Sequence, residues 1–433
     1  MSESSQMELM LPKGMRDLDP PDKILQLRVL DAIRGIFESY GYLPLETPLV
    51  ERMDVLKAKF AAGEGTDVSQ EIFQVTDQGE RELGLRFDMT VPLARYVAMN
   101  PTIKLPFKRY VMGKVFRDGP IKLGRYREFW QADADIIGAP GALADAEGVF
   151  MARDLFTALD LDVTILMSSR ELLRELMDAL DIEESLRGKT IIALDKLKKI
   201  GKDGVIAEMK KTGVSFEQAE RLMSMTDLEG SNEDRLQSLE KILSDSKGCA
   251  RIREILEILK EVPNLVFDPT LARGLEYYTG FFFEVVLNSS QISSSLVGTG
   301  RYDKMIGQFL GGKQEFAAVG ISFGVSVICD ALREKGEGKT RSLTRVFVVP
   351  VSRNERAYAL QIAQQLRGEG INTDLDMLER GIGKNFAYAD TLGIPFVVVV
   401  GDDEMTGGMC SVKNMMTGDQ KKLPIEELIT LVK

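Results

Sequence analysis

Two stretches decide the fold class of this chain: Tyr110-Val-Met-Gly-Lys-Val-Phe116 and Glu128-Phe-Trp-Gln-Ala-Asp-Ala-Asp-Ile-Ile137. Both are rich in branched and aromatic residues, which favour β-strands. Similar runs at Glu71 to Thr76 and Leu83 to Arg86 come before them, and apolar spacing predicts a helix from Pro20 to about Ser39. Turn residues separate the four strand patterns without intervening helices, so we expect an antiparallel sheet.

A long helical region interrupts these strand patterns. Past about Ser168 the chain is dense in Lys, Glu and Leu as far as Leu259, with hardly any strand pattern. Strand patterns return at Gly280 to Leu287 and again within Val319 to Leu332. We therefore expect a discontinuous sheet domain formed by residues 1–167 and 263–334, with a helical insertion domain at residues 168–262.

The C-terminal part of the chain has a different pattern. A polar linker is expected at residues 335–342. After it, Val346 to Val349 and Phe396 to Val400 are short apolar runs, separated by helical patterns such as Ala357 to Leu366. This alternation predicts a small α/β domain at residues 343–433 with a buried, mainly parallel sheet.

The composition restricts the chemistry, because the 433 residues include no histidine. This absence excludes Ser-His-Asp triads, Cys-His dyads and H-E-x-x-H metal sites. The three cysteines are far apart and lack C-x-x-C spacing, which argues against disulfides and zinc clusters. Chemistry in this chain must therefore use arginines, carboxylates, hydroxyls, backbone amides and a hard metal such as magnesium. Nucleotidyl transfer fits this set.

The charge is unevenly distributed. A net charge of −11 is not that of a general nucleic-acid binder. Between Pro101 and Arg127, however, Asp118 is the only acidic residue. The same segment contains the following basic residues: Lys104, Lys108, Arg109, Lys114, Arg117, Lys122, Arg125 and Arg127. Such a stripe predicts a localised anion site, and the alternative is a solvated basic face. No apolar run has the length of a membrane span and the N-terminus lacks signal-peptide features, so a cytoplasmic location is expected.

One stretch carries most of the functional information: Leu271-Ala-Arg-Gly-Leu-Glu-Tyr-Tyr-Thr-Gly280. The glycine lets the backbone approach a ligand closely, and the tyrosines offer hydroxyls on both sides of a strand. The stretch resembles the histidine-specific R-G-L-D-Y-Y signature of histidyl-tRNA synthetases.

The other landmarks of that family follow in its order. They are Lys13-Gly-Met-Arg-Asp17, Tyr42-Leu-Pro-Leu-Glu-Thr-Pro48, Leu85-Arg-Phe-Asp-Met-Thr90, Phe116-Arg117 with Gly124-Arg-Tyr-Arg-Glu-Phe-Trp-Gln131, Gly298-Thr-Gly-Arg-Tyr-Asp303, and Lys384 to Gly401. The resemblance covers essentially the whole chain. It implies the class II synthetase fold, which has an α+β catalytic domain with an antiparallel sheet, a helical insertion domain and a C-terminal α/β anticodon-binding domain.

The resemblance also implies a reaction. The family activates histidine with ATP and Mg²⁺ to histidyl-adenylate and transfers it to tRNA(His). It assigns the catalytic role to Arg117 and Arg273, whose permanently charged guanidiniums flank the α-phosphate. Since the chain has no histidine base, the substrate carboxylate is the expected nucleophile, and a phosphate oxygen of the adenylate is the expected base of the second step.

Substrate-binding residues follow from the same resemblance. Asp135 and Tyr278 match the partners of the two imidazole nitrogens, and discrimination without editing is expected because other amino acids leave those groups unpaired. The α-amino group is assigned to Asp88, Thr90 and Gln131. Tyr277 belongs to the same histidine site, and ATP is assigned to Arg117, Arg125 and Arg273. L-histidine, ATP and tRNA(His) are the expected partners, with a homodimer as the expected assembly.

Two signatures depart from the family pattern. The acidic residue expected two positions after Arg117 is replaced by Gly119, with Asp118 one residue early, so the adenine contacts are open. The third class II signature should end in Glu-Arg, and Ser326 and Val327 stand there instead. This loss removes a phosphate clamp, and our hypothesis is that magnesium and Arg125 compensate.

Two other functions are considered. The first is a catalytically inactive paralogue that serves as the histidine-sensing regulatory subunit of ATP phosphoribosyltransferase. The altered third signature favours it, whereas Arg273 and the predicted anticodon domain oppose it, because that paralogue tends to lose both. The second is a pure RNA-binding module, which does not explain the residues from Arg273 to Tyr278.

Overall fold

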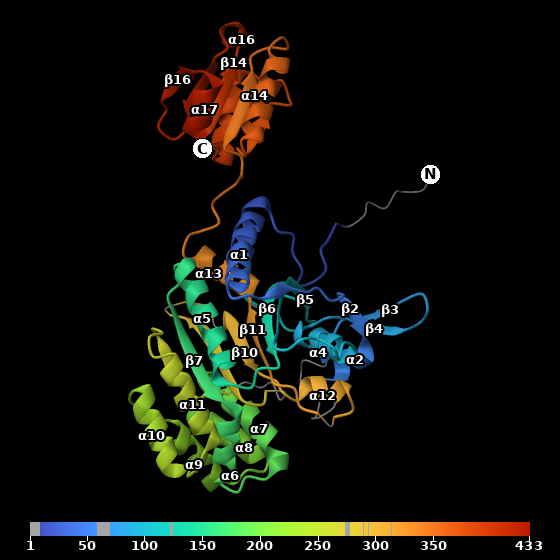
Figure 1. Cartoon of the computed structure of the whole chain (residues 1–433), viewed down its shortest axis with the longest axis vertical. Helices are drawn as coiled ribbons and strands as arrows, with labels where there is room; N and C mark the ends of the chain where they lie inside the picture. The colour runs from blue at the N-terminus through green and yellow to red at the C-terminus, as the bar shows by residue number, and fades with distance from the viewer. Residues whose placement is uncertain are drawn as a thin grey trace. The chain divides into compact units, whose positions relative to one another are not determined.

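The computed structural model describes residues 9–58, 70–121, 124–272, 278–288, 290–292, 294–312 and 314–433. It forms two compact units (Figure 1). The first consists of the described residues within Met1–Arg16 and Arg28–Lys335, and the second of Asp17–Leu27 and Gly336–Lys433. The predicted linker at 335–342 contains no helix or strand. The boundaries of a separate helical insertion domain stay a prediction, because this division does not separate it from the sheet.

An eight-stranded sheet forms the centre of the first unit. Its strands are β1 (Leu43–Pro44), β5 (Phe107–Phe116), β6 (Glu128–Ile137), β11 (Ala318–Phe323), β10 (Val297–Arg301), β9 (Phe281–Leu287), β7 (Val163–Ser169) and β8 (Leu265–Phe267), in that spatial order. From β5 to β7 all neighbours are antiparallel, and the edge strands β1 and β8 are parallel to their neighbours. The predicted antiparallel sheet is confirmed for the patterns at Tyr110 to Phe116 and Glu128 to Ile137. The patterns at Glu71 to Thr76 and Leu83 to Arg86 belong to a separate sheet, and a helix at Thr90–Met99 precedes β5, so the prediction of four strands without an intervening helix is wrong.

One face of this sheet is covered by helices. Phe323 of β11 packs its ring 5.7 Å from Phe37 of α1 (Pro20–Ser39) and 6.3 Å from Phe156 of α5 (Ala142–Ala158). α13 (Val325–Glu334) contacts β6 on the same side. Since side chains alternate along a strand, Ala132, Ala134 and Ile136 of β6 are buried on this face, and Gln131, Asp133 and Asp135 belong to the opposite one.

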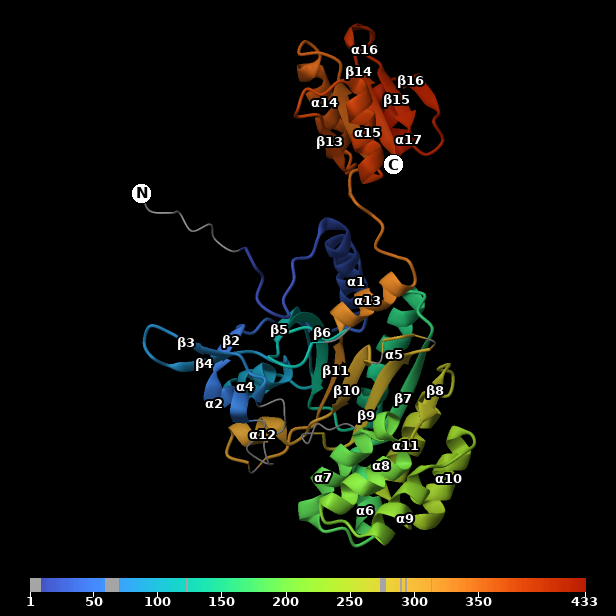
Figure 2. The ribbon, with the colours of Figure 1, turned by 180° about the vertical axis from the view of Figure 1, so that it is seen from behind.

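The opposite face carries a smaller group of elements. A three-stranded antiparallel sheet has the order β2 (Val50–Arg52), β4 (Glu82–Leu85) and β3 (Gln74–Thr76). It lies beside α2 (Met53–Ala58), α4 (Thr90–Met99) and α12 (Met305–Phe309), as Figure 2 shows. Their apolar side chains pack with Ile137 of β6 and Tyr302. The loop that enters α4 is therefore held close to the main sheet.

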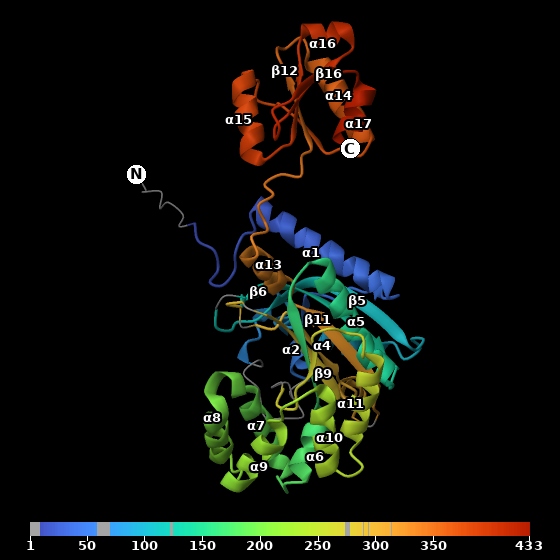
Figure 3. The same ribbon diagram turned by 90° about the vertical axis from the view of Figure 1, so that its left-hand side faces the viewer.

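The helical insertion begins and ends at neighbouring strands. Residues 170–264, all of them described, contain no strand. They form α6 (Arg170–Asp178), α7 (Glu184–Asp195), α8 (Leu197–Lys211), α9 (Phe216–Thr226), α10 (Asn232–Ile242) and α11 (Lys247–Ile258), which gather at one end of the first unit (Figure 3). Serine side chains cap four of these helices at Ser169, Ser215, Ser231 and Ser246, as the short hydroxyl favours. The predicted helical region is confirmed.

The second unit contains a five-stranded sheet with the order β13-β12-β14-β15-β16. The elements are β12 (Val346–Pro350), α14 (Arg356–Gly368), β13 (Thr373–Leu375), α15 (Ile382–Leu392), β14 (Phe396–Val400), α16 (Asp402–Gly407), β15 (Cys410–Asn414), β16 (Gln420–Leu423) and α17 (Ile425–Val432). The prediction of a mainly parallel sheet is wrong for β15 and β16, which pair antiparallel. Their connection is too short for a crossover, and Gly418 has a positive φ in its turn.

No helix of the described residues combines the length and apolar character needed to cross a membrane.

Candidate functional site

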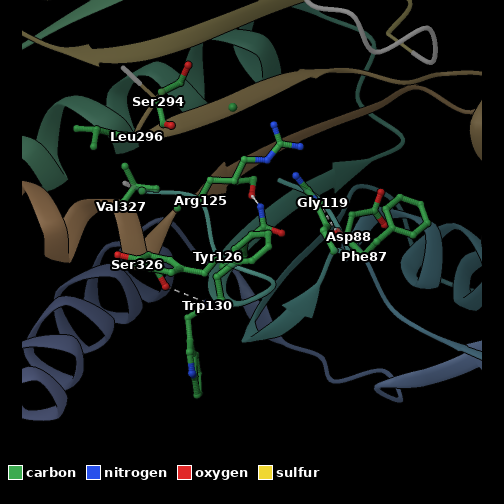
Figure 4. A pocket seen from close by; sticks show the side chains of 18 of the residues that line it. Phe87, Asp88, Gly119, Arg125, Tyr126, Trp130, Ser294, Leu296, Ser326 and Val327 are labelled. Atoms are coloured by element: carbon green, nitrogen blue, oxygen red, sulfur yellow. Dashed lines mark hydrogen bonds between the residues drawn. The ribbon is translucent and has the colours of Figure 1, made fainter. Parts of the chain in front are cut away.

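A cavity of about 340 Å³ lies on the face of the main sheet that carries Gln131 and Asp133, opposite the face covered by α1 and α5 (Figure 4). The loop before α4 and the connection from β5 to β6 line it, together with β6, β11 and the start of α13. The structure brings the following predicted site residues to its wall: Asp88, Thr90, Arg117, Arg125, Gln131 and Tyr278. Arg273 and Tyr277 lie outside the described residues.

A chain of hydrogen bonds links three residues that line this cavity. Gln131 Nε2 donates to Ser322 Oγ (2.9 Å), and Ser322 Oγ donates to Asp133 Oδ1 (2.6 Å). Asp133 stands opposite Ser322 in the register of β6 and β11. Burial raises the pKa of the Asp133 carboxyl to about 7, and the nearby Asp135 carboxylate acts in the same direction. Asp133 and Ser322 were not predicted, although Asp133 shares a strand face with Gln131 and Asp135.

Asp135 does not line the cavity. Its carboxylate lies 2.7 Å from Arg109 Nη2 and accepts a hydrogen bond from the Tyr302 hydroxyl (2.6 Å). Both Asp135 and Arg109 are 2% exposed. Gly320 lies opposite Asp135 on β11, and a Cβ atom there would collide with the carboxylate. The predicted imidazole ligand is thus held by protein partners beside the cavity, and its contact with a substrate stays a prediction.

Arg117 and Tyr278 are both fixed at the wall. Arg117 Nε donates to the Phe87 carbonyl oxygen (3.0 Å), and its guanidinium lies 5.2 Å from the ring centroid of Phe129. The Tyr278 ring stacks on Phe282 and covers Gly300, where any Cβ atom would collide with it. Glycine at position 300 is therefore required by the tyrosine, a close approach of the kind that glycine allows.

Arg125 lines the cavity with a side chain that stays partly exposed. It lies between Val327 on one side and Gly119 on the other (Figure 4). Its Nη2 donates to Glu71 Oε1 (3.1 Å), and Glu71 is buried while the arginine side chain is 44% exposed. A Cβ atom on Gly119 would lie 2.5 Å from Glu71 Oε1. Glu71 thus fills the space beside Gly119, a role that its position in a predicted strand did not suggest.

The altered third signature stands at the start of α13. Ser326 Oγ accepts a hydrogen bond from the Trp130 backbone amide (3.2 Å), so its hydroxyl ties α13 to β6. Val327 lines the cavity. A longer side chain at position 327 would therefore begin at the cavity wall.

The basic stripe does not form one anion site among its described members. Strand alternation divides it, and Arg109 pairs with Asp135 inside the protein. Lys108 pairs with Glu147, Lys114 with Glu128 and Arg127 with Asp118. Of the stripe, Arg117 and Arg125 line the cavity. The anion site in this cavity therefore uses fewer residues of the stripe than the sequence predicts.

Comparison with known proteins decides the family. The family model for histidyl-tRNA synthetase matches residues 14–328, and the model for an anticodon binding domain matches residues 345–433. The chain belongs to the histidyl-tRNA synthetase family. A relative from Bacillus cereus named histidine–tRNA ligase 1 is 39% identical over 437 residues, which cover 98% of this chain and 99% of that protein.

Solved structures agree with this membership of the synthetase family. The crystal structure of histidyl-tRNA synthetase from Nostoc sp. PCC 7120 has a TM-score of 0.86 and 31% identity, with 99% of each chain covered. A structure from Bacillus halodurans, described as an ATP phosphoribosyltransferase regulatory subunit/histidyl-tRNA synthetase, has a TM-score of 0.76 and 23% identity. It covers 92% of this chain and 99% of that one, and shows a shared fold. These relatives confirm the predicted ligase class, the class II fold and the anticodon-binding domain.

Proposed function

We propose that the chain activates histidine with ATP to form histidyl-adenylate and then transfers the histidyl group to the 3′ end of tRNA(His). One observation carries the proposal: the cation Arg117, the phenol Tyr278 and the amino-group ligands predicted from the family line a single cavity. A cation, a hydroxyl and acceptors in one small space suit a substrate that has a phosphate, an imidazole and an ammonium group.

The first step joins the two substrates. An oxygen of the histidine carboxylate attacks the α-phosphorus of ATP, a new P–O bond forms, and pyrophosphate leaves. Negative charge grows on the non-bridging oxygens, and Arg117 offers N–H donors that stabilise it. Arg273 is proposed to lie on the other side of the α-phosphate, because its position in the family motif implies this role. The hydrogen bond to the Phe87 carbonyl fixes the direction of the Arg117 side chain before the substrate arrives.

The second step transfers the histidyl group. A hydroxyl of the terminal tRNA ribose attacks the carbonyl carbon of the adenylate, an ester forms, and AMP leaves. A phosphate oxygen of the adenylate accepts the hydroxyl proton, since the chain has no histidine to act as a base.

Histidine recognition is assigned to residues that line the cavity and to Asp135 beside it. Asp88, Thr90 and Gln131 are proposed to bind the α-amino group, and Tyr278 with Tyr277 the imidazole side. Asp135 is proposed for the second ring nitrogen. Its oxygens keep acceptor capacity after bonding Tyr302 and Arg109, because each carboxylate oxygen has two lone pairs.

The ATP phosphates require further positive charge. Arg125 is proposed to take the place of the missing third-signature arginine, since it lines the same cavity as Val327. No group of three acidic or thiol side chains that suits a metal occurs among the described residues. Mg²⁺ is therefore expected to arrive with ATP, bound mainly by phosphate oxygens and water.

The remaining partners are proposed from the family. The C-terminal unit is expected to read the anticodon and the helices α6 to α11 to lie over the acceptor stem, in a cytoplasmic homodimer. The alternative function is a histidine-sensing subunit of ATP phosphoribosyltransferase, which the substitution of Ser326 and Val327 in the third signature favours. The match of an anticodon binding domain at residues 345–433 argues for the synthetase.

Histidine-dependent exchange of pyrophosphate into ATP tests the proposal. The purified chain should catalyse exchange with histidine and not with the other amino acids, and should then charge tRNA(His). If the chain binds histidine in a calorimeter but never supports exchange, the regulatory function is favoured instead.

A further inference from the structure

We propose that Asp133 is a histidine-binding residue which, together with Asp88 and Gln131, receives the α-ammonium group of the amino acid. Ser322 is the positioning residue that orients both Asp133 and Gln131 for this contact. The inference rests on the proposed function, because it assigns a substrate group to a residue of the same cavity.

The position of Asp133 suits this contact. Asp133 lies on the cavity wall between Gln131 and Asp135 on one strand face, and it is 4% exposed. Asp135 lies behind that wall and already holds Arg109 and Tyr302. Asp133 has no cation within ion-pairing distance among the described residues, since Arg109 pairs with Asp135. A buried carboxylate without a cation is costly unless a cation arrives.

An unused hydrogen-bond acceptor lies beside Asp133. Gln131 Oε1 is buried and accepts no hydrogen bond from the described residues. An ionised Asp133 only accepts, so the Ser322 hydroxyl must donate to it and can then accept from the Gln131 amide nitrogen. This chain turns the amide oxygen of Gln131 away from Ser322. The oxygen is thereby free for a donor that enters the cavity.

The acceptors of the cavity suit the donors of an ammonium group in number. An ammonium group has three N–H donors. The carboxylates of Asp88 and Asp133 and the carbonyl oxygen of Gln131 supply an acceptor for each of them, and all three residues line the cavity. The Thr90 hydroxyl, assigned above to the same group, lines the cavity too and can share one of these donors. Asp88 also accepts from the Val91 amide, which anchors its side chain at the start of α4.

The charges around Asp133 agree with this assignment. Asp135 on the same strand and Asp88 from the loop before α4 raise its pKa, whereas Ser322 from β11 and Arg109 from β5 lower it. Burial is the largest effect and raises the pKa to about 7. An arriving ammonium group favours the ionised form. Of the lining residues, Asp88 and Asp133 are buried whereas the Arg125 side chain is 44% exposed, so the acidic and basic groups of the cavity differ in their access to solvent.

The experiment compares the wild-type chain with Asp133→Asn, which keeps the shape and loses the charge. In pyrophosphate exchange the KM for histidine should rise about tenfold or more, while the KM for ATP should change by less than about twofold. A second readout isolates the ammonium group. Histidinol should inhibit the wild type more strongly than its deamino analogue, 3-(imidazol-4-yl)propan-1-ol, and Asp133→Asn should lose most of this preference.

Two more variants complete the design. Ser322→Ala should shift the same preference in the same direction by a smaller factor, and it carries the test alone if Asp133→Asn does not fold. Glu147→Gln is the matched control, because this half-buried carboxylate on α5 bonds Tyr42 and Lys108 on the other face of the sheet. It should leave the preference unchanged.

The outcomes separate the two proposals. An unchanged preference for histidinol in both Asp133→Asn and Ser322→Ala overturns the role of Asp133 and leaves the proposed function intact. A wild-type chain without exchange activity overturns the proposed function. In that case histidinol and its deamino analogue are compared by calorimetry on the same variants, and loss of the ammonium preference still supports Asp133.

Discussion

The carboxylate of Glu71 lies where the side chain of residue 119 would begin, 2.5 Å from the position of a Cβ atom on Gly119. Gly119→Ala should therefore displace Glu71, and with it Arg125, which Glu71 holds. We expect the KM for ATP in pyrophosphate exchange to rise about tenfold at saturating histidine. Gly35→Ala is the control, since nothing lies within 4 Å of its Cβ position. An unchanged KM in Gly119→Ala would show that Glu71 does not organise the ATP site.

An arginine at position 327 should be able to replace the positive charge of Arg125. Arg125→Ala should raise the KM for ATP about tenfold, because a charged hydrogen-bond donor is lost. Adding Val327→Arg should restore part of the affinity, since position 327 begins at the cavity wall. Arg81→Ala is the control, because it removes an exposed arginine outside the cavity. An unchanged KM in Arg125→Ala eliminates that residue, and lack of rescue eliminates position 327 as a phosphate ligand.

Asp135→Asn should destabilise the protein. Its partner Arg109 is 2% exposed and would keep a buried charge without a counter-charge, at a cost of roughly 3–5 kcal/mol in the free energy of unfolding. Glu128→Gln removes the more exposed pair with Lys114 on the same two strands and should cost about 0–1 kcal/mol. Urea unfolding measures both. Equal losses, with a raised KM for histidine in Asp135→Asn, would mean that Asp135 serves the substrate rather than the fold.

Stability should fall as the pH rises through the titration of Asp133. Burial raises the pKa of its carboxyl from 3.8 to about 7, so the folded state binds this proton more tightly than the unfolded state. The free energy of unfolding without ligand should decrease between about pH 4 and pH 7 and then level off. Asp133→Asn lacks this loss and should gain stability relative to the wild type as the pH rises. Asp145, whose pKa burial raises to about 6, acts in the same direction in both proteins and cancels in the difference. Parallel curves for the two proteins would contradict this account.

In the main sheet, β5, β6, β9 and β11 could be predicted from the sequence, whereas the inner strands β7 and β10 and the edge strands β1 and β8 could not. β6 has the predicted bounds because its residues alternate between two buried faces. β1 and β8 are too short for a pattern. β10 reads Val-Gly-Thr-Gly-Arg, a composition that argues against a strand, and its Gly300 is required by the Tyr278 ring.

The candidate site could be predicted where one stretch of sequence supplies the motif, as for Asp88, Arg117 and Gln131. Residues that enter from distant segments were missed. Ser322 meets Asp133 through the register of β6 and β11, and Glu71 meets Gly119 across a loop. Such pairings depend on how strands align in space, which no local pattern of residues records.

The helical insertion leaves the sheet from β7 and returns as β8, and these neighbours run parallel, with Ile165 opposite Leu265 and Met167 opposite Phe267. In two parallel strands, the end of the first and the start of the second lie at opposite ends of the strands, so a tight turn cannot link them. A shortened chain would still need a connection of about a dozen residues, most simply one helix. Natural or engineered trimming of this region therefore has a lower limit, set by the direction of a three-residue strand rather than by anything the helices bind.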